Sequence, residues 1–187
     1  MALLLKNTPT NYGLVAIALH WLTALAVLFL FGLGLYMTGL DYYDPLYHKA
    51  PWVHKSIGLL CFTLVSFRLF WRIFSNSPKP LGNSKTQKAI AGVAHIVLYV
   101  LMFVGFLSGY LISSADGTAV SIFNWVEIPG VSLDIENQED KAGIVHLYVA
   151  WGLIVLASIH ALAAMKHHFI NRDATLRRML LPSNPAN

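Results

Sequence analysis

The chain has 187 residues, of which 56% are hydrophobic and only 12% are charged. A water-soluble domain carries about a quarter charged residues, so this composition indicates an integral membrane protein. The net charge of +4 does not indicate a nucleic-acid partner, because the basic residues lie between apolar runs rather than in one patch. Cys61 is the only cysteine, which excludes an intrachain disulfide, a zinc-ribbon site and the C-x-x-C-H attachment of a c-type haem.

Four apolar runs are long enough to cross a bilayer, which takes about 20 residues of helix. They predict spans at 13–39, 52–74, 89–112 and 143–165. The first run is too long for the core of a signal peptide and lacks a small-residue cleavage site, so we expect it to be retained. No repeat or linker divides the chain. We therefore expect a single membrane-embedded domain over 1–187, with an all-α fold in which four helices form a membrane bundle.

The distribution of charge predicts how these spans are oriented. Ten of the thirteen Lys and Arg lie near the N-terminus, around the second connection or in the C-terminal tail. The first and third connections, with the start of the second span, hold the other three basic residues. They also hold eight of the nine acids. Because basic loops stay in the cytoplasm, we expect both termini there and, in a Gram-negative host, the acidic connections in the periplasm. The sequence does not settle whether the longer acidic connection, 113–142, holds a short element around "SIFNW".

The fourth span carries a histidine at each end, at His146 and His160. A helix turns 100° per residue and rises 1.5 Å, so fourteen residues return a side chain to within about 40° of its first direction and raise it roughly 21 Å. Both histidines therefore lie on one face, near opposite membrane surfaces. Polar side chains at such depth are usually functional, although two hydrogen bonds to neighbouring helices would also account for them.

The depth of the other histidines suggests partners for these two. The first span reaches His20 within two turns of its cytoplasmic end, and the second begins at its outer end with His54. Depth thus gives an outer pair, His54 with His146, and an inner pair, His20 with His160. Two imidazoles suit a b-type haem, which needs two axial ligands, better than structural zinc, which needs four ligands. With both axial positions filled, we expect electron transfer. His95 also lies at the inner depth, and spacing alone does not choose between it and the others.

The fourteen-residue spacing recurs at two further positions. Arg68 follows the outer histidine of the second span by fourteen residues and reaches the inner depth, where no Asp or Glu lies in any span. We expect it to bind a haem propionate; the alternative is that it only extends to the membrane surface. Gly34 follows the histidine of the first span by fourteen residues and would let a macrocycle approach, or else serves helix packing. Gly105 and Gly109 form a G-x-x-x-G pattern that favours helix packing.

Three stretches resemble the bacterial cytochrome b561 family of four-helix dihaem membrane cytochromes: "ALHWLTALAV", "HKSIGLL" and "HLYVAWGLIVLASIHALAAMKHHF". The resemblance covers nearly the whole chain. It implies two b haems, and it favours His20 over His95 because the family takes its ligands from the first, second and fourth spans. It also implies that ubiquinone accepts the electrons, near the inner surface. The candidate quinone residues are Lys79, Lys85, His95 and His167, for which the alternative role is membrane anchoring.

Two functions fit these features. One is a dihaem oxidoreductase of the bacterial inner membrane that moves electrons between a periplasmic donor and the ubiquinone pool, as superoxide:ubiquinone oxidoreductases of this family do. The other is a haem-carrying anchor subunit that relays electrons for a separate catalytic protein docked on the acidic connection. The eight outer acids argue against superoxide, an anion that a basic surface would attract, although Lys49, Lys55 and Lys141 offer a local basic patch. A transporter is disfavoured because no acid falls within a span core.

Overall fold

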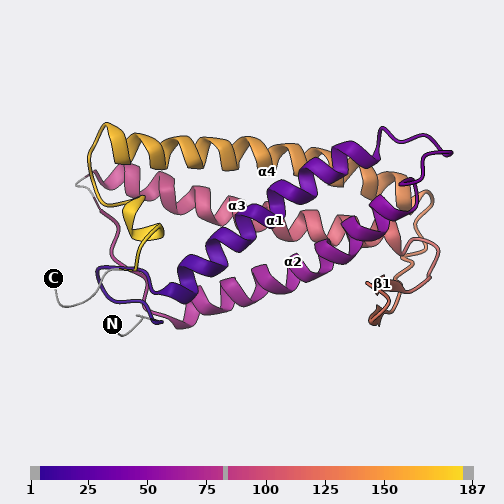
Figure 1. Cartoon of the computed structure of the whole chain (residues 1–187), viewed down its shortest axis with the longest axis horizontal. Coiled ribbons are helices and arrows are strands. Elements are labelled where there is room, and N and C mark those ends of the chain that lie inside the picture. Colours follow the sequence, from indigo (N-terminus) through magenta and orange to yellow (C-terminus); the bar gives the residue numbers. More distant parts are fainter. Residues whose placement is uncertain (1–4, 82–83, 183–187) are drawn as a thin grey trace. The chain divides into compact units, whose positions relative to one another are not determined.

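The computed structural model of this chain describes residues 5–81 and 84–182. Its long helices are α1 (Leu14–Met37), α2 (Lys49–Phe74), α3 (Lys85–Ser113) and α4 (Gln138–Phe169) (Figure 1). Strands β1 (Val120–Ile122) and β2 (Val126–Ile128) lie between α3 and α4, and a short 3-10 helix, η1 (Arg177–Met179), follows α4. All four long helices are apolar and long enough to cross a membrane, which confirms the four predicted spans.

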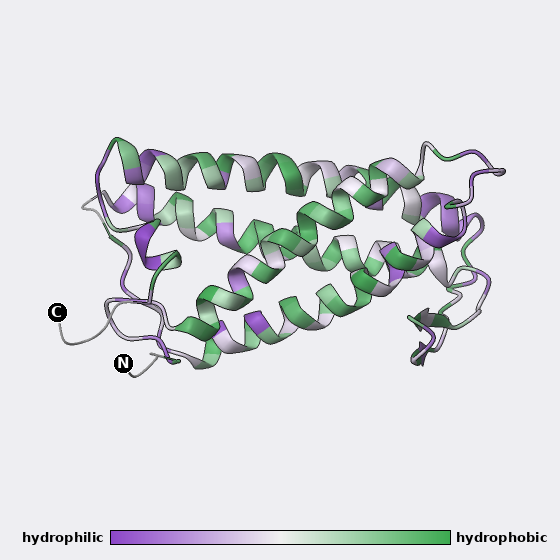
Figure 2. Cartoon of the chain, in the orientation of Figure 1, coloured by the Kyte–Doolittle hydropathy of each residue, from purple (hydrophilic) through white to green (hydrophobic). Residues whose placement is uncertain are grey.

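The helices are apolar around most of their surface, and hydrophilic residues concentrate at their ends and in the connections (Figure 2). Many large apolar side chains on the helices are exposed. A water-soluble protein rarely exposes so much contiguous apolar surface, whereas in a bilayer the same side chains contact lipid. The fold is all-α apart from the hairpin, in agreement with the predicted fold class.

Three of the helices extend beyond the predicted spans. The apolar runs mark the part that crosses hydrocarbon, but a helix continues into polar residues when its ends are stabilised. Ser84 caps α3, because its hydroxyl accepts a hydrogen bond from the Gln87 amide at 3.3 Å. Glu139 and Asp140 lie in the first turn of α4 and Lys166 in its last, where each charge is favourable to the helix dipole.

The chain divides into two compact units. The terminal unit comprises Met1–Ala24, Leu64–Leu98 and Val155–Asn187, and the loop unit comprises Leu25–Thr63 and Tyr99–Ile154. Every long helix contributes one segment to each unit, so no linker in the sequence separates them. A single domain over 1–187 stays a prediction.

Charge is divided unevenly between these units. The terminal unit holds ten of the thirteen Lys and Arg and one of the nine acids, Asp173. The loop unit holds the other three lysines and eight acids. The orientation of the two units across a membrane stays a prediction from this asymmetry.

In the loop unit, the long connection forms a hairpin around the stretch "SIFNW". β1 and β2 are antiparallel, with Val120 opposite Ile128. Phe123 and Asn124 have φ of 48° and 61°, as the two central residues of a type I′ turn require. The positive φ of Phe123 is unusual for an aromatic residue, and it is stabilised by a hydrogen bond from the Phe123 amide to the Ser56 hydroxyl of α2 at 3.0 Å.

In the terminal unit, the tail after α4 folds back onto other segments. The Trp21 indole N–H of α1 donates to the Met179 carbonyl at 2.6 Å. The Arg178 guanidinium donates to the Lys79 carbonyl at 3.0 Å, and the Lys79 amide donates to the Pro9 carbonyl at 3.1 Å. The tail, the connection between α2 and α3 and the N-terminal segment are therefore joined at the end of this unit.

Candidate functional site

The loop unit brings His54 of α2 and His146 of α4 together. Their ring centroids lie 6.2 Å apart, with the ring planes at 77°. An imidazole nitrogen lies about 2 Å from a metal that it binds, so two rings on opposite sides of one ion have centroids roughly 6 Å apart. The separation therefore fits two axial ligands of one iron. Their role as ligands stays a prediction.

Hydrogen bonds that His146 donates to acceptors of α3 orient its ring. Its Nδ1 lies 2.9 Å from the Gly105 carbonyl oxygen and 3.2 Å from the Ser108 hydroxyl. A carbonyl only accepts, so Nδ1 carries the hydrogen and Nε2 keeps its lone pair. A metal-binding histidine has this tautomer and this kind of second contact. Nδ1 of His54 is buried and lacks a hydrogen-bond partner among the described residues.

A glycine on the neighbouring helix faces each of these two histidines. A Cβ atom added to Gly109 would lie 3.0 Å from Cε1 of His146, and one added to Gly34 would lie 3.4 Å from Cε1 of His54. A Cβ atom added to Gly105 would instead lie 3.5 Å from a methyl carbon of Val149. Of the G-x-x-x-G pattern, Gly105 thus packs α3 against α4, whereas Gly109 makes room for a candidate ligand.

The terminal unit brings three histidines together. His20 of α1 and His160 of α4 have ring centroids 6.4 Å apart, again close to the separation of two ligands on one ion. His95 of α3 lies nearer to His160, with centroids 5.2 Å apart, which leaves less room for an ion between the rings. Among the described residues, no group of three or more His, Cys, Asp or Glu is placed to hold a metal ion. The geometry favours the pair of His20 with His160.

Arg68 of α2 contacts this pair. Its Nη2 lies 2.8 Å from Nδ1 of His20. Arginine only donates, so Nδ1 of His20 accepts and the hydrogen of the neutral ring is on Nε2. Binding a metal through Nε2 requires that the hydrogen move to Nδ1 and that Arg68 release it. The loop-unit pair thus fits haem as it stands, and the terminal-unit pair fits it once Arg68 turns away.

The residues predicted for quinone binding all lie in the terminal unit, and each has surroundings of its own. The side chains of Lys79 and of Lys85, the first residue of α3, are exposed. His95 lies beside His160 in the histidine cluster. His167, in the last turn of α4, contacts Asp173 instead.

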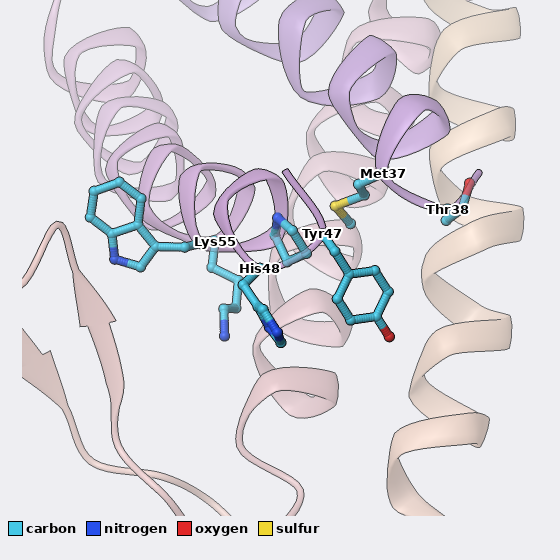
Figure 3. Close-up of a pocket in the computed structure, with 7 residues that line it drawn as sticks. Met37, Thr38, Tyr47, His48 and Lys55 are labelled. Atoms are coloured by element: carbon cyan, nitrogen blue, oxygen red, sulfur yellow. The ribbon is translucent and has the colours of Figure 1, made fainter. Parts of the chain in front are cut away.

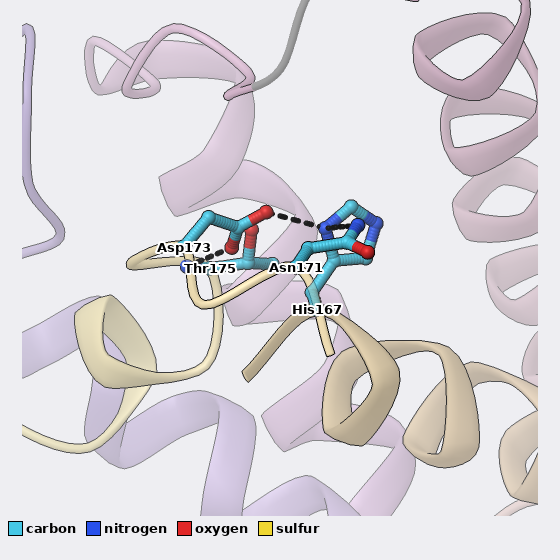
Figure 4. Close-up of polar contacts among 4 residues, drawn as sticks. All are labelled: His167, Asn171, Asp173 and Thr175. Atoms are coloured by element: carbon cyan, nitrogen blue, oxygen red, sulfur yellow. Dashed lines mark hydrogen bonds and ion pairs between the residues drawn. The ribbon is translucent and has the colours of Figure 1, made fainter. Parts of the chain in front are cut away.

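The contacts of His167 fix the start of the tail (Figure 4). Its Nδ1 lies 2.6 Å from Oδ2 of Asp173 and 3.2 Å from the Asn171 amide nitrogen. The Thr175 amide donates to Oδ1 of Asp173 at 2.8 Å. Partial burial opposes ionisation of Asp173, but hydrogen bonds from Thr175 and His167 outweigh it and hold the pKa of this carboxyl below its ordinary value.

Two basic or titratable side chains line a hollow of about 370 Å³ in the loop unit (Figure 3). They are Lys55 and His48, and the other walls come from the end of α1, the loop after it and the first turn of α2. Asp116 is fully exposed; hydrogen bonds from the Thr118 amide and hydroxyl lower its pKa, with a small contribution from the Lys55 charge. Of the three lysines of the expected basic patch, Lys55 lines the hollow and Lys49 and Lys141 do not, so the patch stays a prediction.

Comparison with known proteins identifies the family. The family described as Prokaryotic cytochrome b561 matches residues 11–182. The chain belongs to this family. It is 46% identical to Cytochrome b561 homolog 2 of Escherichia coli (strain K12) over 175 residues, which are 93% of each chain. It is 27% identical to Probable superoxide oxidase CybB of Yersinia pestis, over 91% of this chain and 96% of that protein. It is 28% identical to Cytochrome b561 homolog 1 of E. coli, over 91% and 97%.

As a cytochrome b561 family member, the chain is a bacterial membrane electron-transfer protein, and the family implies b-type haem. The sequence identified the histidines but missed Ser108 and the Gly105 carbonyl, which orient His146. A backbone carbonyl has no signature in the sequence, and Ser108 is one of several hydroxyl residues in the spans. Only their position across from His146 gives them a role.

Proposed function

We propose that this chain is a dihaem b-type cytochrome that moves electrons from a donor at the loop unit to ubiquinone at the terminal unit. The observation that carries the proposal is the presence of one histidine pair in each unit, with ring separations of 6.2 and 6.4 Å. Each pair joins two different helices, as the bundle sites of flat cofactors require.

His54 and His146 would hold one haem, and His20 and His160 the other. When bound, b-type haem supplies an iron that accepts and releases one electron at a time. The Gly105 carbonyl and Ser108 hold His146 in the metal-binding tautomer. Both pairs lie on the apolar helices that are long enough to span a membrane.

Different residues of the two units support the two ends of the electron path. Lys79, Lys85 and His167 lie on the terminal unit, whose basic residues suit the cytoplasmic membrane surface. At the loop unit, Lys55 is a candidate contact for a small anionic donor, and the name of the Yersinia pestis relative makes superoxide the first donor to test. An anchor subunit remains the second candidate, because the hairpin exposes 82% of Trp125, a residue type enriched at protein interfaces.

The haem assignment is tested by single His→Ala variants of the four ligands. We expect about two haems per wild-type chain, all removed by acid–acetone because no covalent attachment exists. Reduced-minus-oxidised spectra of the variants should fall into two classes, one for His54 and His146 and one for His20 and His160. Haem loss in the His95→Ala variant, with both haems kept in His20→Ala, would contradict the proposed pair.

The electron path is tested on the purified chain alone. We expect it to reduce a soluble ubiquinone analogue when superoxide is generated enzymatically, at a rate that falls in the Lys55→Gln variant. If the chain carries two haems but reduces quinone with neither superoxide nor a chemical reductant, the anchor-subunit function is favoured. If the rate of superoxide oxidation does not depend on added quinone, quinone is not the electron acceptor.

A further inference from the structure

A second hollow lies in the terminal unit, away from the histidine cluster. It has a volume of about 350 Å³ and is formed where the N-terminal segment meets the end of α2. Its lining combines aromatic and polar side chains. The lining residues are Lys6, Asn7, Phe70, Trp71, Phe74, Ser75 and Asn76.

Hydrogen bonds within the unit hold part of the polar lining in place. The Asn7 amide group donates to the Ser75 hydroxyl oxygen at 3.0 Å, and its carbonyl oxygen accepts from the Gly13 amide at 2.8 Å. The Ser75 hydroxyl therefore acts as an acceptor toward Asn7 and retains its own hydrogen to donate. The N-terminal segment is thus held against the end of α2 with a donor facing the hollow.

A further donor is buried in the wall. The indole Nε1 of Trp71 is buried and has no hydrogen-bond partner among the described residues. A buried N–H without an acceptor is costly, and tryptophan N–H groups in membrane proteins usually find a partner at the membrane–water interface. Trp71 is among the residues that line the hollow, so a small rotation of its side chain would bring this N–H to an acceptor bound there.

The charge around the hollow favours an anion. Lys6 lines it with an exposed side chain, and Arg72 lies in the last turn of α2. These cations offset the partial negative charge at the C-terminal end of that helix. The one acid of the terminal unit, Asp173, is already engaged by His167. Phe70 and Phe74 are exposed and pack together with ring centroids 4.4 Å apart, which gives an apolar surface beside the donors.

We propose that this hollow binds one anionic phospholipid. Lys6 pairs with the charge of the phosphate, the Trp71 indole and the Ser75 hydroxyl donate to its oxygens, and Phe70 and Phe74 contact the acyl chains. Hydrogen-bond donors and a cation next to exposed aromatic rings match a phosphate joined to hydrocarbon. They match a free phosphate less well, because it has no apolar part to contact the rings. The proposal does not depend on the identity of the electron donor or acceptor.

Native mass spectrometry of the detergent-purified holoprotein tests the site. Dioleoyl phosphatidylglycerol is titrated against dioleoyl phosphatidylcholine, which has the same chains and a zwitterionic headgroup. We expect one saturable phosphatidylglycerol. Lys6→Gln should weaken this binding about fivefold, as for one lysine beside an anionic lipid surface. Trp71→Phe should weaken it at least about tenfold, as for a lost hydrogen bond to a charged group.

The matched control is Lys88→Gln, which removes one charge from the same unit but does not line the hollow. It should bind as the wild type does. If all three variants bind the lipid equally, the protein attracts anionic lipid diffusely and the proposed site is wrong. Displacement of the lipid by millimolar inorganic phosphate would overturn it in favour of a free-phosphate site, and displacement by a short-chain ubiquinone in favour of a quinone site. The elution volume and the haem spectrum show whether each variant folds. If Trp71→Phe does not fold, the Lys6→Gln variant decides the test, because Lys6 is exposed.

Discussion

The close approach of Gly109 to His146 gives a prediction whose size follows from the structure. In Gly109→Ala, the new Cβ would lie 3.0 Å from Cε1 and 3.2 Å from Nδ1 of the imidazole. Carbon atoms normally approach to about 3.5–4.0 Å, so the ring must retreat from α3 by roughly 0.5 Å. The Nδ1 contact with Ser108 is already 3.2 Å long and would be lost, and the bond to the Gly105 carbonyl, now 2.9 Å, would stretch.

The expected free-energy change combines two opposing effects. Overpacking in a helix interface costs about 1–3 kcal/mol, whereas replacing a helical glycine by alanine gains about 1 kcal/mol. Gly109→Ala should therefore lower the free energy of unfolding by about 0–2 kcal/mol. Gly58→Ala is the matched control, because its added Cβ meets no atom within 4 Å and only the gain applies.

Two measurements check this prediction. Thermal unfolding of the two variants in detergent should differ by about 2–4 °C for each kcal/mol between them, with Gly109→Ala the less stable. Haem content should also fall in Gly109→Ala and stay unchanged in Gly58→Ala, because only the former disturbs a candidate ligand. If the two variants unfold at the same temperature and retain the same haem, Gly109 has no role in positioning His146.

Two further predictions concern the terminal unit. Once Arg68 has turned from His20, we expect its guanidinium to pair with a haem propionate. Arg68→Leu should therefore weaken haem retention at the His20 pair by up to about 3 kcal/mol and lower its midpoint potential, since a nearby positive charge stabilises the reduced form. Arg68→Lys should rescue only partly, because an ammonium lacks the planar fork of a guanidinium. An unchanged potential in a redox titration would show that Arg68 does not act on the haem that this pair would hold. The pKa of Asp173 is depressed in the fold, so its stabilisation of the tail is complete above the ordinary aspartate pKa of about 3.9 and is lost as the pH falls through the lower native value. The protection of the Thr175 amide from hydrogen exchange, relative to the intrinsic exchange rate at each pH, should fall at acid pH in the wild type and be low at every pH in Asp173→Ala. Equal protection in the two proteins at neutral pH would show that Asp173 does not hold this amide.

The sequence by itself determined the four spans and the position of each histidine along its span. Hydropathy identifies the spans because a helix must be apolar over about 20 residues to cross hydrocarbon. The fourteen residues between His146 and His160 fix their separation along the helix axis because the rise of a helix is constant. These quantities depend only on position along one helix, so no knowledge of neighbouring helices is needed. The sequence predicted the helix ends less exactly, because caps such as Ser84 extend a helix beyond its apolar part.

The tertiary structure decided which groups meet between helices. Depth alone did not separate His20 from His95, but the ring distances to His160, 6.4 and 5.2 Å, differ. The hydrogen bond from His146 to the Gly105 carbonyl and that from Arg68 to His20 both cross between helices. The rotation of each helix about its axis is set by packing against its neighbours, and one sequence read along its length does not contain that angle. The tautomers of the candidate ligands, and with them their readiness to bind iron, are therefore properties of the tertiary structure.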